Sequence, residues 1–355
     1  MRRAGVVALW LVLANGQATA DAVVSAAGDP GPAAAQSLLV VIPVDYEGQI
    51  GDALVLAESI RTFAGTLAEV PVTIYAPSRL APALAEQEER LTELAVGTRT
   101  VEVPRRALDF VLGAKPFTAA QAERDADDVD LVAVVAPNTI VLQPPLAFLL
   151  PATADLGWST VHHQNVGSLA SKPPDGFWSR LYTVLGVRRE QVFTNQTLAE
   201  DATVRFYFNA GSFVVRPEHG LLQRWSEAFH QLIADQEMAE LCADGPWNVF
   251  LHQAALAGAA LASLEQADTV RLPDTYSYPL LFERFHGGPR TFDSLEGVVT
   301  MRREFRSEDL PPGWEHGVTA PSEVLAWIID RLARINHRGS QRGARDVVHR
   351  GVPTR

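Results

Sequence analysis

Several side chains suited to binding a negatively charged ligand stand next to apolar runs of this sequence. Asp45 and Tyr46 follow the apolar run 37–43, and Lys115 precedes the apolar run 130–135. A lysine held at a binding site would neutralise negative charge, and the ring of Tyr46 would offer a stacking surface. Simpler explanations exist, because isolated lysines are usually surface charges and an aspartate that follows a strand commonly forms a turn.

A second set of polar residues is suited to holding a hydroxyl-bearing ligand. Asn209 and Gly211 belong to the stretch Tyr-Phe-Asn-Ala-Gly, Gln253 lies in a predicted helix, and His163 lies in the polar loop 162–165. Structural roles are equally open: Gly211 would supply a positive φ in a turn in which Asn209 bonds the backbone. The loop would then simply be solvated, and half-buried amides such as that of Gln253 are common on helices.

Motifs that the sequence lacks narrow the chemistry further. The chain has no G-x-x-x-x-G-K-[ST], no G-x-G-x-x-G, no G-x-S-x-G and no H-E-x-x-H, so kinase, Rossmann dehydrogenase, serine hydrolase and zincin functions lose their usual support. The single cysteine, Cys242, excludes an intramolecular disulfide and a Cys-rich zinc site. We expect Cys242 to be a small core residue.

The elements that must position these residues alternate between strand-like and helix-like runs. This alternation predicts an α/β fold with a mostly parallel sheet flanked by helices. In such sheets ligands bind beyond the carboxyl ends of the strands, where Asp45 and the turn 136–139 are expected. The predicted strands are 37–43, 70–75, 98–103 and 130–135, and the predicted helices are 53–63, 80–94 and 118–123.

Beyond residue 151 the alternation loosens. The stretch 206–216 predicts a turn that enters a strand, and helices are predicted over 218–238 and 247–261. A last helix opens near residues 319–323 and carries an apolar stripe.

An ordered set of segments resembles the GT-A glycosyltransferases, within them the glycogenin and lipopolysaccharide galactosyltransferase-like group. Residues 37–65 resemble the opening strand and helix of that fold, and 130–142 (DLVAVVAPNTIVL) resembles the strand that leads into the Asp-x-Asp turn. Residues 207–211 (YFNAG) are similar to the Phe-Asn-Ala-Gly turn. Weaker likenesses follow in the right order, with His252-Gln253 in place of an Asp-Gln-Asp helix and Leu272-Pro273 before Tyr276.

This resemblance, which covers roughly residues 37–278, implies a nucleotide-diphospho-sugar donor and a carbohydrate or glycan acceptor. It implies roles for the residues singled out above. The donor-binding candidates are Asp45, Tyr46, Arg61, Lys115 and Asn138, with Arg216 as a further basic candidate. The acceptor-binding candidates are Asn209, Gly211, His163 and Gln253. No catalytic residue is assigned.

The sequence departs from that family at its chemical centre. Metal-dependent members use two carboxylates one residue apart, because hard oxygen ligands hold Mn²⁺ or Mg²⁺ against the diphosphate. Here the aligned turn is Ala136-Pro137-Asn138, so Asn138 retains only a neutral carbonyl oxygen as a weak ligand. The late His-x-Gly metal ligand is not evident, and His286 is the nearest candidate. We therefore expect weak or absent dependence on a divalent metal.

The ends of the chain predict processing rather than structure. Arg2 and Arg3, a short apolar run and a small-x-small site ending at Ala20 are typical of a secretory signal peptide over 1–20, followed by a linker over 21–36. A permanent membrane anchor and a buried strand are the weaker alternatives. Between the linker and a disordered basic tail over 336–355, residues 37–335 are expected to form a single domain.

Composition and these signals define the working hypotheses. A net charge of −12 over 355 residues argues against nucleic acid as the partner. The leading hypothesis is a secreted, periplasmic or lumenal glycosyltransferase that transfers a hexosyl group to a hydroxyl. The alternative is an inactive GT-A-fold carbohydrate-binding or scaffold protein, and a periplasmic solute-binding protein is a more distant third.

Overall fold

The structure is a computed structural model that describes residues 36–243, 245–280, 294–303, 310 and 313–342. The predicted signal peptide, the linker up to residue 35 and His286 lie outside the described residues, as does the chain after 342. The last helix extends to Arg342, past residue 336, where the basic tail was predicted to begin. Among the described residues, no helix combines the length and apolar character needed to cross a bilayer.

A seven-stranded sheet forms the centre of the described domain, in the order β10-β6-β9-β4-β1-β2-β3. All of its neighbouring strands run parallel except β9, which is antiparallel to both β4 and β6. The prediction of a mostly parallel α/β sheet is therefore confirmed. The strands are β1 (Leu38–Pro43), β2 (Val72–Pro77), β3 (Val96–Val101), β4 (Leu131–Val135), β6 (Leu156–Thr160), β9 (Phe208–Val215) and β10 (Thr269–Arg271).

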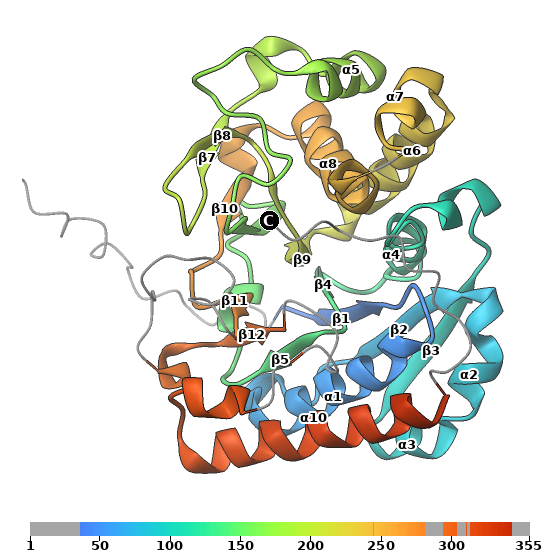
Figure 1. Cartoon of the computed structure of the whole chain (residues 1–355), viewed down its shortest axis with the longest axis vertical. Coiled ribbons are helices and arrows are strands. Elements are labelled where there is room, and N and C mark those ends of the chain that lie inside the picture. The colour runs from blue at the N-terminus through green and yellow to red at the C-terminus, as the bar shows by residue number, and fades with distance from the viewer. Residues whose placement is uncertain (1–35, 244, 281–293, 304–309, 311–312, 343–355) are drawn as a thin grey trace, which may run out of the picture. The chain divides into compact units, whose positions relative to one another are not determined.

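Helices cover both faces of the sheet (Figure 1). Alternate side chains of β1 explain this, because Leu39 and Val41 pack in one apolar cluster with α4, α6 and α8, while Val40 and Ile42 pack in another with α1. A strand buried on both faces reads as a continuous apolar run. The helices are α1 (Gly48–Phe63), α2 (Ala81–Ala85), α3 (Glu88–Glu93), α4 (Lys115–Arg124), α5 (Gly176–Leu185), α6 (Leu221–Ala234), α7 (Gln236–Leu241), α8 (Pro246–Ser263) and α10 (Ser322–Arg342).

Two helices predicted as continuous are interrupted in the structure. The predicted helix 80–94 is divided into α2 and α3, and the predicted helix 218–238 is divided into α6 and α7. At the second break Asp235 adopts an extended backbone conformation, and its carboxylate accepts a hydrogen bond from the Met238 amide at 2.9 Å. Asp235 thus ends one helix and caps the next.

Two small sheets flank the central one. The first contains β5 (Thr139–Val141), β11 (Tyr278–Pro279) and β12 (Thr300–Arg302), with β12 antiparallel to β5. The second pairs β7 (Thr194–Gln196) with β8 (Thr203–Arg205). Because β5 directly follows the turn 136–138, the first small sheet brings the late segment β12 next to that turn.

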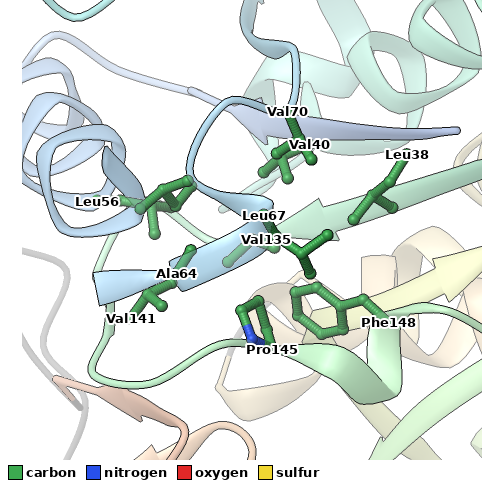
Figure 2. Close-up of a pocket in the computed structure, with 11 residues that line it drawn as sticks. Leu38, Val40, Leu56, Ala64, Leu67, Val70, Val135, Val141, Pro145 and Phe148 are labelled. Atoms are coloured by element: carbon green, nitrogen blue, oxygen red, sulfur yellow. The ribbon is translucent and has the colours of Figure 1, made fainter. Parts of the chain in front are cut away.

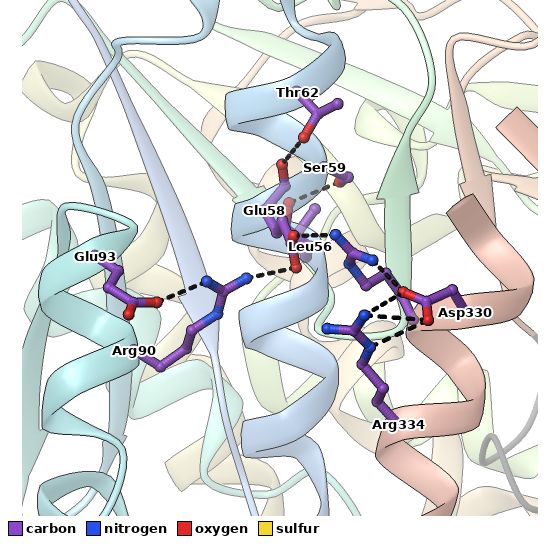
Figure 3. A network of polar contacts seen from close by, with 9 residues as sticks. Leu56, Glu58, Ser59, Thr62, Arg90, Glu93, Asp330 and Arg334 are labelled. Carbon is purple, nitrogen blue, oxygen red and sulfur yellow. Dashed lines mark hydrogen bonds and ion pairs between the residues drawn. The ribbon is translucent and has the colours of Figure 1, made fainter. Parts of the chain in front are cut away.

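Helix α10 docks against α1 through a network of charged side chains (Figure 3) and one aromatic contact. Glu58 of α1 pairs with Arg90 of α3 at 2.7 Å and with Arg331 of α10 at 2.6 Å. The rings of Phe63 and Trp327 meet edge to face with centroids 5.2 Å apart. The C-terminal helix is thereby fixed to the first helix of the domain.

A small pocket lies between α1 and the sheet (Figure 2). Its walls carry no polar side chain, so it offers nothing that would orient a charged or hydroxylated ligand. We interpret it as a packing gap. The residues around it are Leu38, Val40, Leu56, Ile60, Ala64, Leu67, Val70, Val135, Val141, Pro145 and Phe148.

Candidate functional site at the carboxyl edge of the sheet

The carboxyl ends of β1, β4 and β6 share one edge of the sheet, because these strands run in the same direction. Strand β9 runs the other way, so its first residues lie at that edge too. The residues that follow β1 and β4 are therefore brought together with the start of the Tyr-Phe-Asn-Ala-Gly stretch, as the sequence predicts.

The pairing of β9 with β6 is irregular at this edge. Trp158 pairs with Phe213, whereas the next residue, Ser159, pairs with Asn209. Residues 210–212 of β9 therefore have no partner on β6 and form a bulge. The bulge exposes the backbone of Ala210 to side chains instead of to a neighbouring strand.

Asn209 and Gly211 shape this bulge. The side-chain oxygen of Asn209 accepts a hydrogen bond from the Gly211 amide at 2.7 Å, as the structural alternative predicts. The expected positive φ is wrong, because Gly211 is not among the residues with positive φ. Glycine is needed for space instead: a Cβ at position 211 would lie 2.8 Å from Asn209 Oδ1.

Lys115 approaches the bulge from the first turn of α4. Its side chain is almost fully buried, and its Nζ donates a hydrogen bond to the Ala210 carbonyl at 2.6 Å. Burial lowers the pKa of this amine to about 8, against the charge of Asp45, which raises it; the charge of Arg302 lowers it further. Lys115 is thus a buried cation at the predicted edge, and the interpretation as an ordinary surface charge is wrong.

Asp45 faces Lys115 and caps α4. Its Oδ1 accepts hydrogen bonds from the Ala114 and Lys115 amides, each at 3.0 Å, which replaces the turn role expected from sequence. Its Oδ2 is buried, with no hydrogen-bond partner among the described residues. Burial raises the pKa of Asp45 to about 6, although the charge of Lys115 and the two amides oppose the rise. Tyr46, the next residue, stays 39% exposed.

Helix α8 closes the far side of the bulge. Gln253 is buried, and its Oε1 accepts a hydrogen bond from the Ala210 amide at 3.2 Å. Since Lys115 bonds the Ala210 carbonyl, both backbone polar groups of Ala210 are bonded to side chains. The neighbouring His252 is buried with its Nδ1 2.9 Å from the Val249 carbonyl. Burial and the nearby charge of Lys115 lower the pKa of His252 to about 3, so its ring is neutral at neutral pH.

The turn that stands in place of an Asp-x-Asp motif is held by backbone contacts. The side-chain amide of Asn138 donates to the Arg303 carbonyl, and the Asn138 carbonyl accepts from the Arg303 amide at 3.0 Å. The Ala136 amide donates to the Gly211 carbonyl at 2.7 Å. The turn thus ties β12 and β9 together.

These residues do not fit a divalent ion. A Mn²⁺ or Mg²⁺ site needs several anionic or carbonyl oxygen ligands directed at one point. The part of the chain that the structure describes has no group of three His, Cys, Asp or Glu side chains that could hold a metal. The side-chain nitrogen of Asn138 donates to the Arg303 carbonyl, and the role of its side-chain oxygen as a weak ligand stays a prediction.

Two arginines of β12 and its end were missed by sequence reasoning. Arg302 pairs with Thr139 in the register of β12 and β5, and its Nη2 lies 3.1 Å from Nδ1 of His162, which follows β6. Arg303 is 1% exposed and forms an ion pair with Asp52 of α1. No motif surrounds this Arg-Arg pair in the sequence, and only the short run 298–301 before it hints at a strand.

Arg61 and Arg216 lie at the opposite, amino edge of the sheet, so their candidate roles in binding a donor are not supported. Arg61 donates to four backbone carbonyls, of Ala68, Val70, Leu94 and Ala95, just before β2 and β3 begin. Arg216 follows the end of antiparallel β9 and donates to the carbonyls of Ala154, Leu150 and Pro151. Both side chains hold loops.

The polar loop after β6 is partly tied down. His163 Nδ1 lies 2.9 Å from a carboxylate oxygen of Glu200, and Gln164 donates to the Gly167 carbonyl at 2.9 Å. The role of His163 toward an acceptor stays a prediction. Asn195, which begins an Asn-x-Thr glycosylation sequon, is buried; its side chain bonds both the Tyr207 amide and the Tyr207 carbonyl.

Comparison with known proteins places this site in context. Residues 42–263 match the model of a family described as the Rhodobacterales glycosyltransferase domain. No curated protein matches the chain.

Similar solved structures include the galactosyltransferase LgtC in complex with donor and acceptor sugar analogues, at 14% identity and a TM-score of 0.44, covering 84% of this chain and 95% of that one. They also include the bifunctional glycosyltransferase WbbM (11%, TM-score 0.48, 88% and 53%) and mouse xyloside xylosyltransferase 1 (9%, TM-score 0.43, 76% and 97%).

Proposed function

Because the chain belongs to the Rhodobacterales glycosyltransferase domain family, we propose that it transfers a hexosyl group from a nucleoside-diphosphate sugar to a hydroxyl at the carboxyl edge of its sheet. The observation that carries the location is the buried amine of Lys115, which donates a hydrogen bond to the Ala210 carbonyl and lies within the electrostatic influence of Asp45. Buried cations at an open strand edge are suited to a phosphorylated ligand.

The reaction assigns simple tasks to the protein. The acceptor oxygen bonds to the anomeric carbon, the bond from that carbon to the diphosphate oxygen breaks, and the diphosphate leaves with the electron pair. The acceptor proton passes to solvent. Negative charge grows on the leaving diphosphate, so a fixed cation near it stabilises the transition state more than the ground state.

We propose that this reaction does not depend on a divalent metal. Two observations support this: positions 136–138 lack a carboxylate pair, and the described residues contain no cluster of His, Cys, Asp or Glu that could hold a metal. Positive side chains are present at the same edge, and they can supply the charge that the leaving group requires.

The direct test is a panel of UDP, GDP and CMP sugars, with thermal shift to detect binding and product analysis to detect donor hydrolysis or transfer. Each donor is measured with EDTA and with Mn²⁺. We expect one nucleotide class to stabilise the protein and to be turned over equally in both conditions. Silence across the whole panel would reject the enzymatic proposal, and turnover that appears only with Mn²⁺ would reject metal independence alone.

A carbohydrate-binding protein without turnover is the second candidate. The loss of both Asp-x-Asp carboxylates favours it, since Ala136 and Asn138 occupy those positions. Binding of an immobilised glycan, measured without any donor, together with silence in the donor panel would support this candidate. Transfer that disappears in a folded Lys115→Met variant would reject it.

We further propose that the protein is exported and cleaved after Ala20, as its N-terminal sequence pattern supports. Expression of the full chain in a bacterial host with fractionation of the periplasm is the test. N-terminal sequencing should then begin at Asp21. A product that begins at Met1 and stays in the cytoplasm would overturn this proposal.

A further inference from the structure

An exposed apolar surface lies where the loop between β3 and α4 meets the start of α8. Leu108 and Val111 of that loop are 37% and 48% exposed, and Leu241, which ends α7, is 38% exposed. Asn248 of α8 joins these segments. Its Oδ1 accepts a hydrogen bond from the Val111 amide at 3.2 Å, and its Nδ2 donates to the carbonyl of Cys242, next to Leu241, at 3.4 Å. Three large apolar side chains are therefore exposed on segments that one asparagine joins.

This surface borders the candidate site along both elements. The loop is followed directly by α4, in which Lys115 lies four residues after Val111. On α8, Val249 and Phe250 are partly exposed and lie four and three residues before Gln253, so they share its helix face. Because Lys115 and Gln253 both bond the bulge of β9, the surface extends to the edge of that bulge. We call this surface the apolar rim, and it consists of Leu108, Val111, Leu241, Val249 and Phe250.

The backbone of the loop fixes Val111 in its exposed position. Before it, the ring of Phe110 packs edge to face against Phe229 of α6, with centroids 5.9 Å apart. After it, Leu112 has a φ of +57°, a conformation that residues other than glycine rarely adopt. The Val111 amide itself is bonded to Asn248. An unfavourable backbone conformation that the surrounding structure maintains is typical of segments that bind ligands.

The two substrates of the proposed reaction differ in what they can place on an apolar surface. The diphosphate and the sugar of the donor are polar, and valine and leucine side chains offer them no hydrogen bond in exchange for water. The acceptor must present a hydroxyl to the reaction, but the group attached to its other end takes no part in bond formation. Contiguous apolar side chains beside a site favour an apolar ligand group. The acceptor is therefore the substrate whose remote end can cover the apolar rim.

We propose that the apolar rim binds an apolar substituent of the acceptor, so that the acceptor is an amphiphilic glycoside with an alkyl or aryl group rather than a free sugar. This inference rests on the proposed function. The acceptor hydroxyl lies at the bulge, and the substituent extends over Leu108 and Val111. These two side chains determine acceptor specificity through the apolar area that they bury.

The test compares methyl and n-octyl glycosides of glucose, galactose and mannose as acceptors, below the concentration at which the octyl compounds form micelles. With the donor that the nucleotide-sugar panel identifies, kcat/KM for the octyl member of an accepted pair should exceed that for the methyl member by about tenfold to a hundredfold. This range corresponds to burial of about two to three methylene groups. Equal values in an enzyme that does transfer sugar would overturn the inference and leave the proposed function intact.

Binding in the absence of donor separates the inference from the proposed function. Titration calorimetry of the full chain should show tighter binding of n-octyl glucoside than of methyl glucoside. If the donor panel is silent and this difference is present, the proposed transfer fails while the apolar rim still binds the alkyl group. If the two glucosides bind equally, the inference fails whether or not a donor is turned over.

Variants assign the effect to the surface. The double variant Leu108→Ser/Val111→Ser should lower the octyl-to-methyl ratio to about one to three, because it removes most of the exposed apolar area of the loop. The matched control is Leu146→Ser in the segment after β5, whose side chain is 55% exposed, and it should keep the wild-type ratio. An unchanged ratio in the double variant, or an equal fall in the control, would contradict the assignment. If the double variant does not fold, Val111→Ser decides, with a fall of about threefold expected.

Other occupants of the apolar rim would give different results. If the rim holds the nucleotide base, the double variant should raise KM for the donor and leave the octyl-to-methyl ratio unchanged. If a second copy of the chain covers the rim, the wild type should sediment as a dimer and the double variant as a monomer, again with an unchanged ratio. Either outcome would overturn the proposal.

Discussion

Basic side chains at the two edges of the central sheet differ in how many hydrogen bonds they donate to the backbone. At the amino edge, Arg61 donates to four carbonyls and Arg216 to three. At the carboxyl edge, Lys115 donates to one carbonyl, that of Ala210. The side chains of Arg61 and Arg216 therefore have a structural role, because their donors bond backbone carbonyls. Lys115 retains donor capacity, because an ammonium has three N–H groups.

Two carboxylates that cap helices show the same contrast. Glu123 at the amino edge uses both oxygens, accepting from the Leu222 amide at 2.9 Å and from the Gln223 amide at 2.8 Å. Asp45 at the carboxyl edge uses one oxygen for its cap and keeps Oδ2 buried and without a hydrogen bond among the described residues. In this pair of helix caps, the carboxylate at the amino edge is fully used by backbone amides, whereas the one at the carboxyl edge is only half used.

The largest expected effect comes from removing the charge at the carboxyl edge. Lys115→Met should lower kcat/KM for donor hydrolysis or transfer by about 10²- to 10³-fold, because a fixed charge near the leaving group acts mainly in the transition state. Steady-state kinetics with the donor identified by the panel is the measurement. Preserved activity in this variant would break the contrast between the edges.

Removing the corresponding charge at the amino edge should act on stability instead. Arg61→Met leaves four carbonyls without their donor, so the free energy of unfolding should fall by about 2–4 kcal/mol. Chemical denaturation measures it. At a temperature where the variant is folded, kcat/KM should equal that of the wild type, and a selective loss of kcat would instead return Arg61 to the donor site.

The pH dependence should also distinguish the edges. Burial lowers the pKa of Lys115 in the folded protein to about 8, from the ordinary lysine value of 10.5. Because the free protein must hold Lys115 protonated to bind a diphosphate, kcat/KM should fall above pH 8, approaching about tenfold for each further pH unit. Arginine stays charged throughout this range. A flat profile from pH 7 to pH 10 would contradict the role of Lys115.

The low pKa of Lys115 should also be visible in stability, as a pH-dependent difference in unfolding free energy between the wild type and Lys115→Met. A lysine whose pKa is lower in the folded state binds fewer protons when folded between pH 8 and 10.5, so wild-type stability rises relative to the variant across that window. We expect the gap in unfolding free energy to change by about 3 kcal/mol. Parallel denaturation curves at pH 7 and pH 10.5 measure it, and an unchanged gap would contradict the low pKa.

The smallest effect is expected where α10 docks on α1, on the side of α1 that carries Glu58 (Figure 3). Burial alone would raise the pKa of Glu58, but hydrogen bonds from Arg331 and Arg90 outweigh it and the pKa is lowered. Glu58→Gln should therefore cost about 1 kcal/mol at neutral pH, fading as the pH falls through the folded-state pKa. Thermal melts at pH 7 and pH 3 measure this, and activity should not change.

Local sequence patterns predicted where strands lie better than they predicted how the strands pair. The apolar runs at 37–43 and 130–135 predicted β1 and β4 to within a residue, because short runs rich in valine are typical of strands buried on both faces. The antiparallel direction of β9 and its bulge could not be predicted, since pairing and register depend on strands distant in sequence.

Some residues of the candidate site could be predicted from local sequence, and others could not. Asp45, Asn209 and Gln253 were identified because they follow strands or belong to a family motif, and Lys115 joined them for the same reason. Arg61 remained a candidate beside Lys115 in the sequence, because only the fold shows how many acceptors surround a cation. Arg302 could not be found at all, since a short strand late in the chain brings it to the edge.

The buried sequon has a practical consequence for anyone producing this protein. Oligosaccharyltransferases modify chains as they emerge, before the side chain of Asn195 can reach its hydrogen bonds with Tyr207 and Thr160. A glycan on Asn195 would keep this side chain from being buried in β7. Secretion from yeast or insect cells should therefore yield little folded material, Asn195→Gln would remove the glycan but also the bonds, and a bacterial host avoids the conflict.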